Sequence, residues 1–103
     1  MSPQALEHFH RVLNVLYSDK KKRYVDALDL CSIGFVNYMQ ESLFIAWKYF
    51  DDTVYILKQT QGEFHTDVAE MIFNIAKYEM KAGRLNGTLP KLLESTMITR
   101  LIF

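Results

Sequence analysis

Turn-forming residues are scarce in this sequence: its 103 residues include four glycines and two prolines. An all-β domain needs a turn signal about every 8–12 residues, so this composition argues against one. No segment shows the sustained alternation of apolar and polar residues that is typical of strands. Half of the residues are nevertheless hydrophobic and 14% are aromatic, which is enough to build one packed domain. We therefore expect a single all-α domain spanning residues 1–103.

Cysteine, net charge and long apolar runs are also lacking. Cys31 is the one cysteine, so no disulfide forms within the chain and a reducing compartment is favoured. Twelve basic residues balance twelve acidic ones, which gives no support to binding of nucleic acid or acidic lipid. No apolar run reaches the ~18 residues of a membrane span. The first 18 residues lack the uninterrupted apolar centre of a secretory signal. We expect a cytoplasmic protein without a nucleic-acid partner or a membrane span; an organelle matrix is the alternative location.

Apolar residues recur at steps of three and four in five segments, as in amphipathic helices. The segments cover residues 3–18, 24–40, 42–60, 67–82 and 88–102. The second is apolar nearly all round, which is typical of a helix packed between neighbours. The fifth carries its apolar residues at Leu89, Leu92, Leu93, Met97, Leu101 and Ile102.

Several residues mark the expected boundaries of these helices. The basic run 20–23 is interpreted as part of a solvated loop between the first two, with a phosphate-binding patch as the alternative. Gly62 is expected to end the third helix in a left-handed conformation. Asp67, followed three residues later by a glutamate, resembles a capping box at the start of the fourth. Because an established helix does not tolerate Pro90, the fifth is predicted to begin near residue 88, after a turn at residues 86–87.

A period of about 42 residues links the segments. An Ala-x-x-x-Phe pattern begins at residues 5 and 46, and Thr-x-x-x-Leu follows at residue 88. Gly34 of the second segment likewise recurs as Ala76 of the fourth. Two interleaved signals with one period are typical of a solenoid of helical pairs, in which small residues permit close crossing and large ones fill the space toward the next pair. The residues predicted to do this packing are Phe9, Gly34, Ala46, Phe50, Ala76 and Leu92.

This arrangement resembles the tetratricopeptide repeat (TPR), in which a small residue is followed twelve residues later by Ala and then by an aromatic residue. Gly34, Ala46 and Phe50 stand at these intervals. The 42-residue period and the run GEFHTDVA at 62–69 are similar to the kinesin-light-chain type, although Thr66 stands where Pro is usual. The resemblance implies a short right-handed α-solenoid of five helices in antiparallel pairs. The pairs would cover about 24–60 and 67–102, after a lone helix at 3–18; an ordinary five-helix bundle is the alternative.

Residues that could carry catalysis or hold a metal are not arranged for either. His8 and His10 are two residues apart, so they point to different faces of a helix, and His65 lies in a predicted loop. Paired carboxylates such as Asp51 and Asp52 fall on a predicted solvated helix edge. The sequence contains no nucleophile–base motif, phosphate-binding glycine loop or Glu-x-x-His pair. We therefore expect no enzymatic activity, no cofactor and no metal.

The expected function is binding of a partner protein or peptide in a concave groove. The resemblance implies that the first helix of each pair lines it. Alternatives are a purely structural subunit of a large complex, or the peptide-sensing half of a bacterial regulator. The apolar end of the last segment further predicts association, by homodimerisation through the C-terminal helix or by docking on a larger partner. The expected groove residues are Phe35, Tyr38, Met39, Phe73, Asn74, Lys77 and Lys81.

Overall fold

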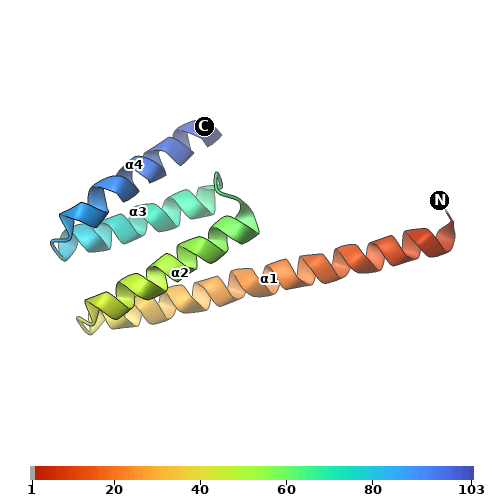
Figure 1. The fold of residues 1–103 in the computed structure, drawn as a ribbon, viewed down its shortest axis with the longest axis horizontal. Helices are drawn as coiled ribbons and strands as arrows, with labels where there is room; N and C mark the ends of the chain where they lie inside the picture. The colour runs from red at the N-terminus through yellow and green to blue at the C-terminus, as the bar shows by residue number, and fades with distance from the viewer. Residues whose placement is uncertain (1) are drawn as a thin grey trace.

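The computed structural model describes residues 2–103, which form four α-helices (Figure 1). No β-strand occurs among these residues, so the predicted all-α class is confirmed. Successive helices run antiparallel, and the first and second, like the third and fourth, pack as hairpins. A smaller contact between the second and third helices joins the two hairpins. The helices are α1 (Pro3–Met39), α2 (Leu43–Gln61), α3 (Thr66–Lys81) and α4 (Leu85–Ile102).

The helices predicted at residues 3–18 and 24–40 form one continuous helix, α1, so the prediction of five helices is wrong. The predicted break at 18–23, including the basic run, is helical throughout. Neither glycine nor proline interrupts this stretch, and Lys and Arg have high helix propensity. The basic side chains of the run are exposed. The hydrophilic run at 20–23 therefore belongs to solvent-exposed turns of α1, and not to a loop between two helices.

Both hairpins turn through the same hydrogen-bonded motif, displaced by 42 residues. The residue after each first-helix cap is left-handed, with φ of 63° at Glu41 and 79° at Gly83. The two backbone bonds around each of them form a Schellman motif, which satisfies carbonyl groups at the helix end. These bonds run from Ser42 N–H to Asn37 O, Glu41 N–H to Tyr38 O, Arg84 N–H to Glu79 O and Gly83 N–H to Met80 O, at 2.8–3.1 Å.

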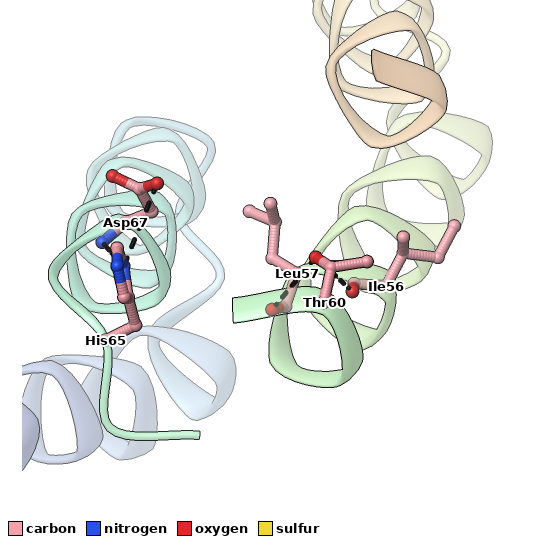
Figure 2. A network of polar contacts seen from close by, with 5 residues as sticks. All are labelled: Ile56, Leu57, Thr60, His65 and Asp67. Carbon is pink, nitrogen blue, oxygen red and sulfur yellow. Dashed lines mark hydrogen bonds and ion pairs between the residues drawn. The ribbon is translucent and has the colours of Figure 1, made fainter. Parts of the chain in front are cut away.

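Between the hairpins, α2 ends at a glycine. Gly62 has φ of 97° and ψ of 154°, a region of backbone conformation open essentially to glycine. Gly62 therefore ends α2 with a positive φ, as predicted, but its ψ differs from that of the left-handed helical conformation. Just before it, the Thr60 hydroxyl donates to Ile56 O at 3.0 Å and lies 3.4 Å from Leu57 O, as Figure 2 shows.

His65, and not Asp67, caps the N-terminus of α3. The His65 Nδ1 atom accepts a hydrogen bond of 3.0 Å from the Asp67 backbone N–H (Figure 2). The capping box predicted from Asp67 is therefore wrong, because the helix begins at Thr66, two residues earlier than that box requires. The Asp67 carboxylate instead lies in the first turn, where the helix dipole favours negative charge.

The fourth helix also begins earlier than predicted. α4 starts at Leu85 and includes the expected turn at 86–87 as well as Pro90. Proline there removes one backbone donor near the start of the helix. The first turn is held by Thr88, whose N–H and hydroxyl both donate to Arg84 O, at 3.2 and 2.8 Å.

Two buried clusters form the core. Gly34 is buried where α1 crosses α2: a Cβ atom on it would lie 2.9 Å from Phe50 Cε1 and 3.1 Å from Tyr49 Cβ. The expected close approach is present, but its neighbours are Phe50 and Tyr49 and not Ala46. Ala46, Phe50 and Ala76 are fully buried, and Leu92 is half-buried. The clusters are Ala27, Leu57, Val68, Ala69, Ile72 and Ile98, and Ala46, Trp47, Phe50 and Ile75.

The N-terminal half of α1 extends beyond the other three helices (Figure 1). Leu6, Phe9, Leu13 and Leu16 are 45–59% exposed on it. At helical spacing they continue the stripe that packs against α2 farther along α1. Phe9, predicted to fill space between repeats, is instead 52% exposed, because no other described helix lies alongside this half.

Candidate interaction surface

α1 and α3 run in the same direction, one on each side of α2 (Figure 1). Their side chains meet in two places. Cys31 Sγ lies 3.7 Å from Met71 Sδ, and the ring centroids of Tyr38 and Tyr78 are 4.9 Å apart. α1 and α3 therefore border one common surface, although their backbones are not in direct contact.

Five aromatic rings fix the relative position of α1, α2 and α3 near the hairpin turns. The Tyr78 ring lies 5.9 Å from Phe35 and 5.7 Å from Phe50, centroid to centroid. The Trp47 ring lies 6.1 Å from Tyr38 and 5.9 Å from Phe50. These separations fall in the range in which aromatic pairs attract each other. The cluster packs α1, α2 and α3 together beneath the surface that α1 and α3 share.

Beside this cluster, α1 exposes a strip of apolar side chains. Helical periodicity places its members on one side of α1, adjacent to the Cys31 and Tyr38 positions that contact α3. A contiguous exposed apolar patch of this kind marks an interaction site in many soluble proteins. The strip consists of Val25, Leu28, Phe35, Val36 and Met39, which are 42–65% exposed.

The neighbouring face of α3 is mostly polar. The Lys77 ammonium lies 5.1 Å from the centroid of the Phe73 ring, within the range of a cation–π interaction. Asn74 is half-buried and is the one amide on this face. It lines a small hollow between α1 and α3 together with Tyr24, Leu28, Leu57, Asp67, Glu70 and Met71.

The expected groove residues divide into three sets. Phe35 and Tyr38 meet Tyr78 of α3, and Asn74 shares its hollow with Leu28. Met39 and Lys81 are the last residues of α1 and α3, and lie at the turn end of the surface. Phe73, with Lys77 over its ring, forms the third set. Phe73 lines a second hollow, between α3 and α4, with Thr66, Ala69, Glu70, Ser95, Thr96, Thr99, Arg100 and Phe103.

Leu28 and Tyr24 were missed as groove residues. Leu28 lies seven residues before Phe35, which places both on the same face of α1. That spacing could have identified Leu28 from the sequence. Tyr24 lies fourteen residues before Tyr38, so the same spacing could have identified it as well. Only its place in the hollow depends on how α3 packs against α1.

The Cys31 thiol lies at the α1–α3 contact. Burial raises its pKa above the ordinary value, so it remains protonated at neutral pH. The nucleophilic form of cysteine is the thiolate, and this environment therefore suits packing against Met71 better than chemistry.

A hollow lined by two acidic and two basic residues lies on α2 beside the α3–α4 turn. Burial is the main reason why the pKa of Asp51 is raised, and nearby Glu79 and Asp52 act in the same direction. The cations Lys91 and Arg84 oppose this shift, and the Arg84 guanidinium also lies 5.6 Å from the Trp47 ring. The hollow is lined by Phe44, Trp47, Lys48, Asp51, Asp52 and Arg84.

One ion pair between α3 and α4 has a buried carboxylate and a partly exposed cation. Glu79 is 1% exposed, and its Oε1 atom lies 2.7 Å from Lys91 Nζ. Glu79 Oε2 has no hydrogen-bond partner, and it lies where a Cβ atom on Gly87 would come within 1.9 Å of it. The absence of a side chain at Gly87 therefore makes room for this carboxylate.

Within residues 2–103, no three His, Cys, Asp or Glu side chains are gathered so as to hold a metal ion. None of the four described helices combines the length and the apolar character needed to cross a membrane. No protein-family model, curated protein or solved structure matches this chain. The interpretation of the surface therefore depends on its geometry and chemistry.

Proposed function

We propose that this protein is a non-enzymatic interaction module, an adaptor or assembly factor of the cytoplasm. It binds a segment of a partner protein along the surface shared by α1 and α3. The observation that carries this proposal is the exposed apolar strip of α1 beside the half-buried Asn74 and the lysines of α3. An apolar face flanked by convergent polar groups is the usual composition of a peptide-binding groove.

The two hairpins are proposed to be successive repeats of the tetratricopeptide type. The proposal is supported by their identical turns, because Glu41 and Gly83 are both left-handed and 42 residues apart. It is also supported by burial of Gly34 and Ala76, which stand at the same separation. In such a repeat array, α1 and α3 are the helices that line the inner face.

The chemistry of the surface indicates which kind of partner segment it can bind. Leu28, Phe35 and Met39 suit apolar side chains spaced along one face of a helix or an extended segment. Asn74 can both donate and accept hydrogen bonds, so it can bind the backbone of an extended ligand. Lys77 and Lys81 favour acidic residues near one end. We therefore expect an amphipathic segment with an acidic end.

Site-specific photo-crosslinking in cells tests the proposal. A photoreactive amino acid replaces Phe35 in one variant and Tyr55 in the other. Both side chains are exposed, at 42% and 63%, but Tyr55 lies on α2, outside the proposed surface. We expect crosslinks to one defined partner from position 35 and none to that partner from position 55.

The identified partner segment then allows a quantitative test. Asn74→Ala should weaken its binding about five- to tenfold, since a hydrogen bond contributes roughly 1 kcal/mol, and Lys77→Glu should weaken binding to an acidic segment further. Tyr55→Ala is the matched control and should leave the dissociation constant unchanged. Equal crosslinking from both positions, or equal affinity of all variants, would contradict a groove on α1 and α3.

A purely structural subunit of a large complex is the second candidate. It is favoured by two further uncovered apolar faces, on the N-terminal half of α1 and on α4. A subunit covered on several sides should aggregate when purified alone at micromolar concentration. An adaptor should form no large aggregates, and light scattering distinguishes the two.

A further inference from the structure

α4 exposes most of its large apolar residues and buries mainly small and polar ones, with Ile98 as the exception. The residues it turns inward include Thr88, Ser95 and Ile98, which are 2–6% exposed. The predicted apolar stripe of this helix is therefore not its packing face. Five outward-facing residues, here called the α4 ridge, are 62–67% exposed: Leu85, Leu89, Leu93, Met97 and Leu101.

Polar contacts hold α4 in this orientation. Lys91 Nζ lies 2.7 Å from the buried Glu79 Oε1 on α3, and Glu94 Oε1 lies 2.6 Å from Lys58 Nζ on α2. The Ser95 hydroxyl donates to Ala69 O at 3.0 Å. Rotating α4 to bury the ridge would break all three contacts and leave the Glu79 carboxylate buried without a cation. The ridge is therefore exposed because these contacts fix α4 in this orientation, and not because α4 is loosely packed.

The spacing of the ridge residues makes the ridge self-complementary. Its members are spaced by four residues, so they form one row of the kind that interlocks with an equivalent row when two helices cross at about −50°. The row is also symmetric about Leu93. In an antiparallel crossing at Leu93, the Leu93 side chains of two copies meet, and Leu89 of each copy lies opposite Met97 of the other. A twofold dimer requires such a self-complementary surface.

The charges of α4 select the antiparallel arrangement. Lys91 and Glu94 are engaged within the chain, away from the ridge. Arg100 is the remaining charged side chain of α4. In an antiparallel crossing at Leu93 it lies opposite Asn86, whereas in a parallel crossing it would lie opposite its own copy. Antiparallel helices also place opposite ends of their dipoles together.

We propose that the α4 ridge is the contact surface of a homodimer, in which two copies of α4 cross antiparallel at Leu93. α4 lies at the outer edge of the molecule (Figure 1), so this face is open to a second copy. The contact is confined to one face of one helix, whereas a typical stable interface buries ~800 Å² per partner. We therefore expect dissociation in the micromolar range.

Sedimentation equilibrium of the full chain between about 1 and 100 µM tests the association. Wild type should shift from the mass of one chain to twice that mass. Leu93→Asp places two carboxylates together at the twofold axis and should raise the dissociation constant at least tenfold. Leu13→Asp, on the equally uncovered stripe of α1, is the matched control and should leave it unchanged. A wild type that stays monomeric, or a dimer broken by Leu13→Asp alone, would overturn the proposal.

Disulfide trapping tests the register independently of any loss of affinity. In a Cys31→Ser background, Leu93→Cys should oxidise to a covalent dimer, because a disulfide needs Cα atoms about 4.4–6.8 Å apart. Leu89→Cys alone should not, whereas a mixture of Leu89→Cys and Met97→Cys chains should give the mixed dimer. Efficient trapping by Leu89→Cys alone would indicate a parallel crossing and contradict the proposed one. Apart from the background substitution Cys31→Ser, which every trapped chain carries, none of these substitutions lies on the α1–α3 surface, so failure here leaves the proposed function standing.

Discussion

The Phe50 ring lies directly against Gly34, so close that a Cβ atom at position 34 would come within 2.9 Å of Phe50 Cε1. Phe50 is fully buried, and its ring also contacts Trp47 and Tyr78. Glycine in the middle of a helix costs roughly 1 kcal/mol relative to alanine. Its presence in α1 is therefore explained by the packing of α1 on α2 and not by helix propensity.

Gly34→Ala should destabilise the protein by about 1–2 kcal/mol. Overpacking a core costs typically about 1–3 kcal/mol, and the higher helix propensity of alanine offsets part of this. Urea unfolding followed by circular dichroism measures the change. In a Phe50→Leu background, which leaves space beside position 34, the same substitution should cost less. A midpoint unchanged or raised in both backgrounds would show that the contact does not limit the approach of the helices.

The two hairpin turns should respond oppositely to substitution. Glu41 has a left-handed backbone that costs a side-chain-bearing residue roughly 1–2 kcal/mol, so Glu41→Gly should stabilise the protein by about 0.5–1 kcal/mol after the greater entropy of unfolded glycine is subtracted. Gly83→Ala introduces the same strain and should destabilise it by about 1 kcal/mol. Thermal unfolding of the two variants is compared with wild type. The same sign of effect at both positions would contradict the equivalence of the turns.

Removing the cation of the buried ion pair should be strongly destabilising. Lys91→Met leaves the Glu79 carboxylate, 1% exposed, without its partner, at a cost of about 3 kcal/mol. Neutralising the acid as well, in Lys91→Met/Glu79→Gln, should recover much of this loss. Denaturant unfolding of the single and double variants is the measurement. A double variant less stable than Lys91→Met would show that the charge on Glu79 is not the source of the cost.

Asp51 should make stability depend on pH. Burial raises its pKa in the folded protein, so the folded state holds the proton more tightly than the unfolded chain does. Its contribution to stability therefore improves as pH falls through the folded pKa and is unfavourable at neutral pH. Asp51→Asn should be more stable than wild type at pH 7, and this advantage should fall toward zero below the ordinary Asp pKa of about 3.9. The difference in melting temperature across this range checks the sign, and an advantage that grows on acidification would contradict it.

Some of the fold could be predicted because it depends on local pattern. Spacings of three and four located the helical segments, and Gly62 marked the end of α2. The start of α3 at Thr66 and of α4 at Leu85 could not be predicted in this way. Both depend on which side chain or backbone group satisfies the first turn, and several candidates lay close together in the sequence. In the structure the His65 side chain caps α3, whereas Arg84 stands at the N-cap of α4 without a side-chain hydrogen bond.

The candidate site shows a similar division. Phe35 and Asn74 were predicted from the groove positions that the resemblance implies, and periodicity gave only the side of the helix on which each lies. The contact of Phe35 with Tyr78, and the hollow that Asn74 shares with Tyr24, depend on the angle between α1 and α3. That angle is set by packing on α2, through residues distant in sequence from both.

The sequence by itself determined that this protein is all-helical, because its apolar residues repeat at helical spacing and it has few residues that form turns. It also determined the positions of close packing at Gly34, Ala46 and Phe50, since their sizes suit helix crossings. The tertiary structure alone decided that residues 3–39 are one helix and that α4 faces outward with its leucines. Helix propensity permits a break or a continuation at the basic run, and an amphipathic pattern does not say which face a neighbour will cover. In α4, the ion pair between Glu79 of α3 and Lys91 helps to determine which face of the helix packs inward.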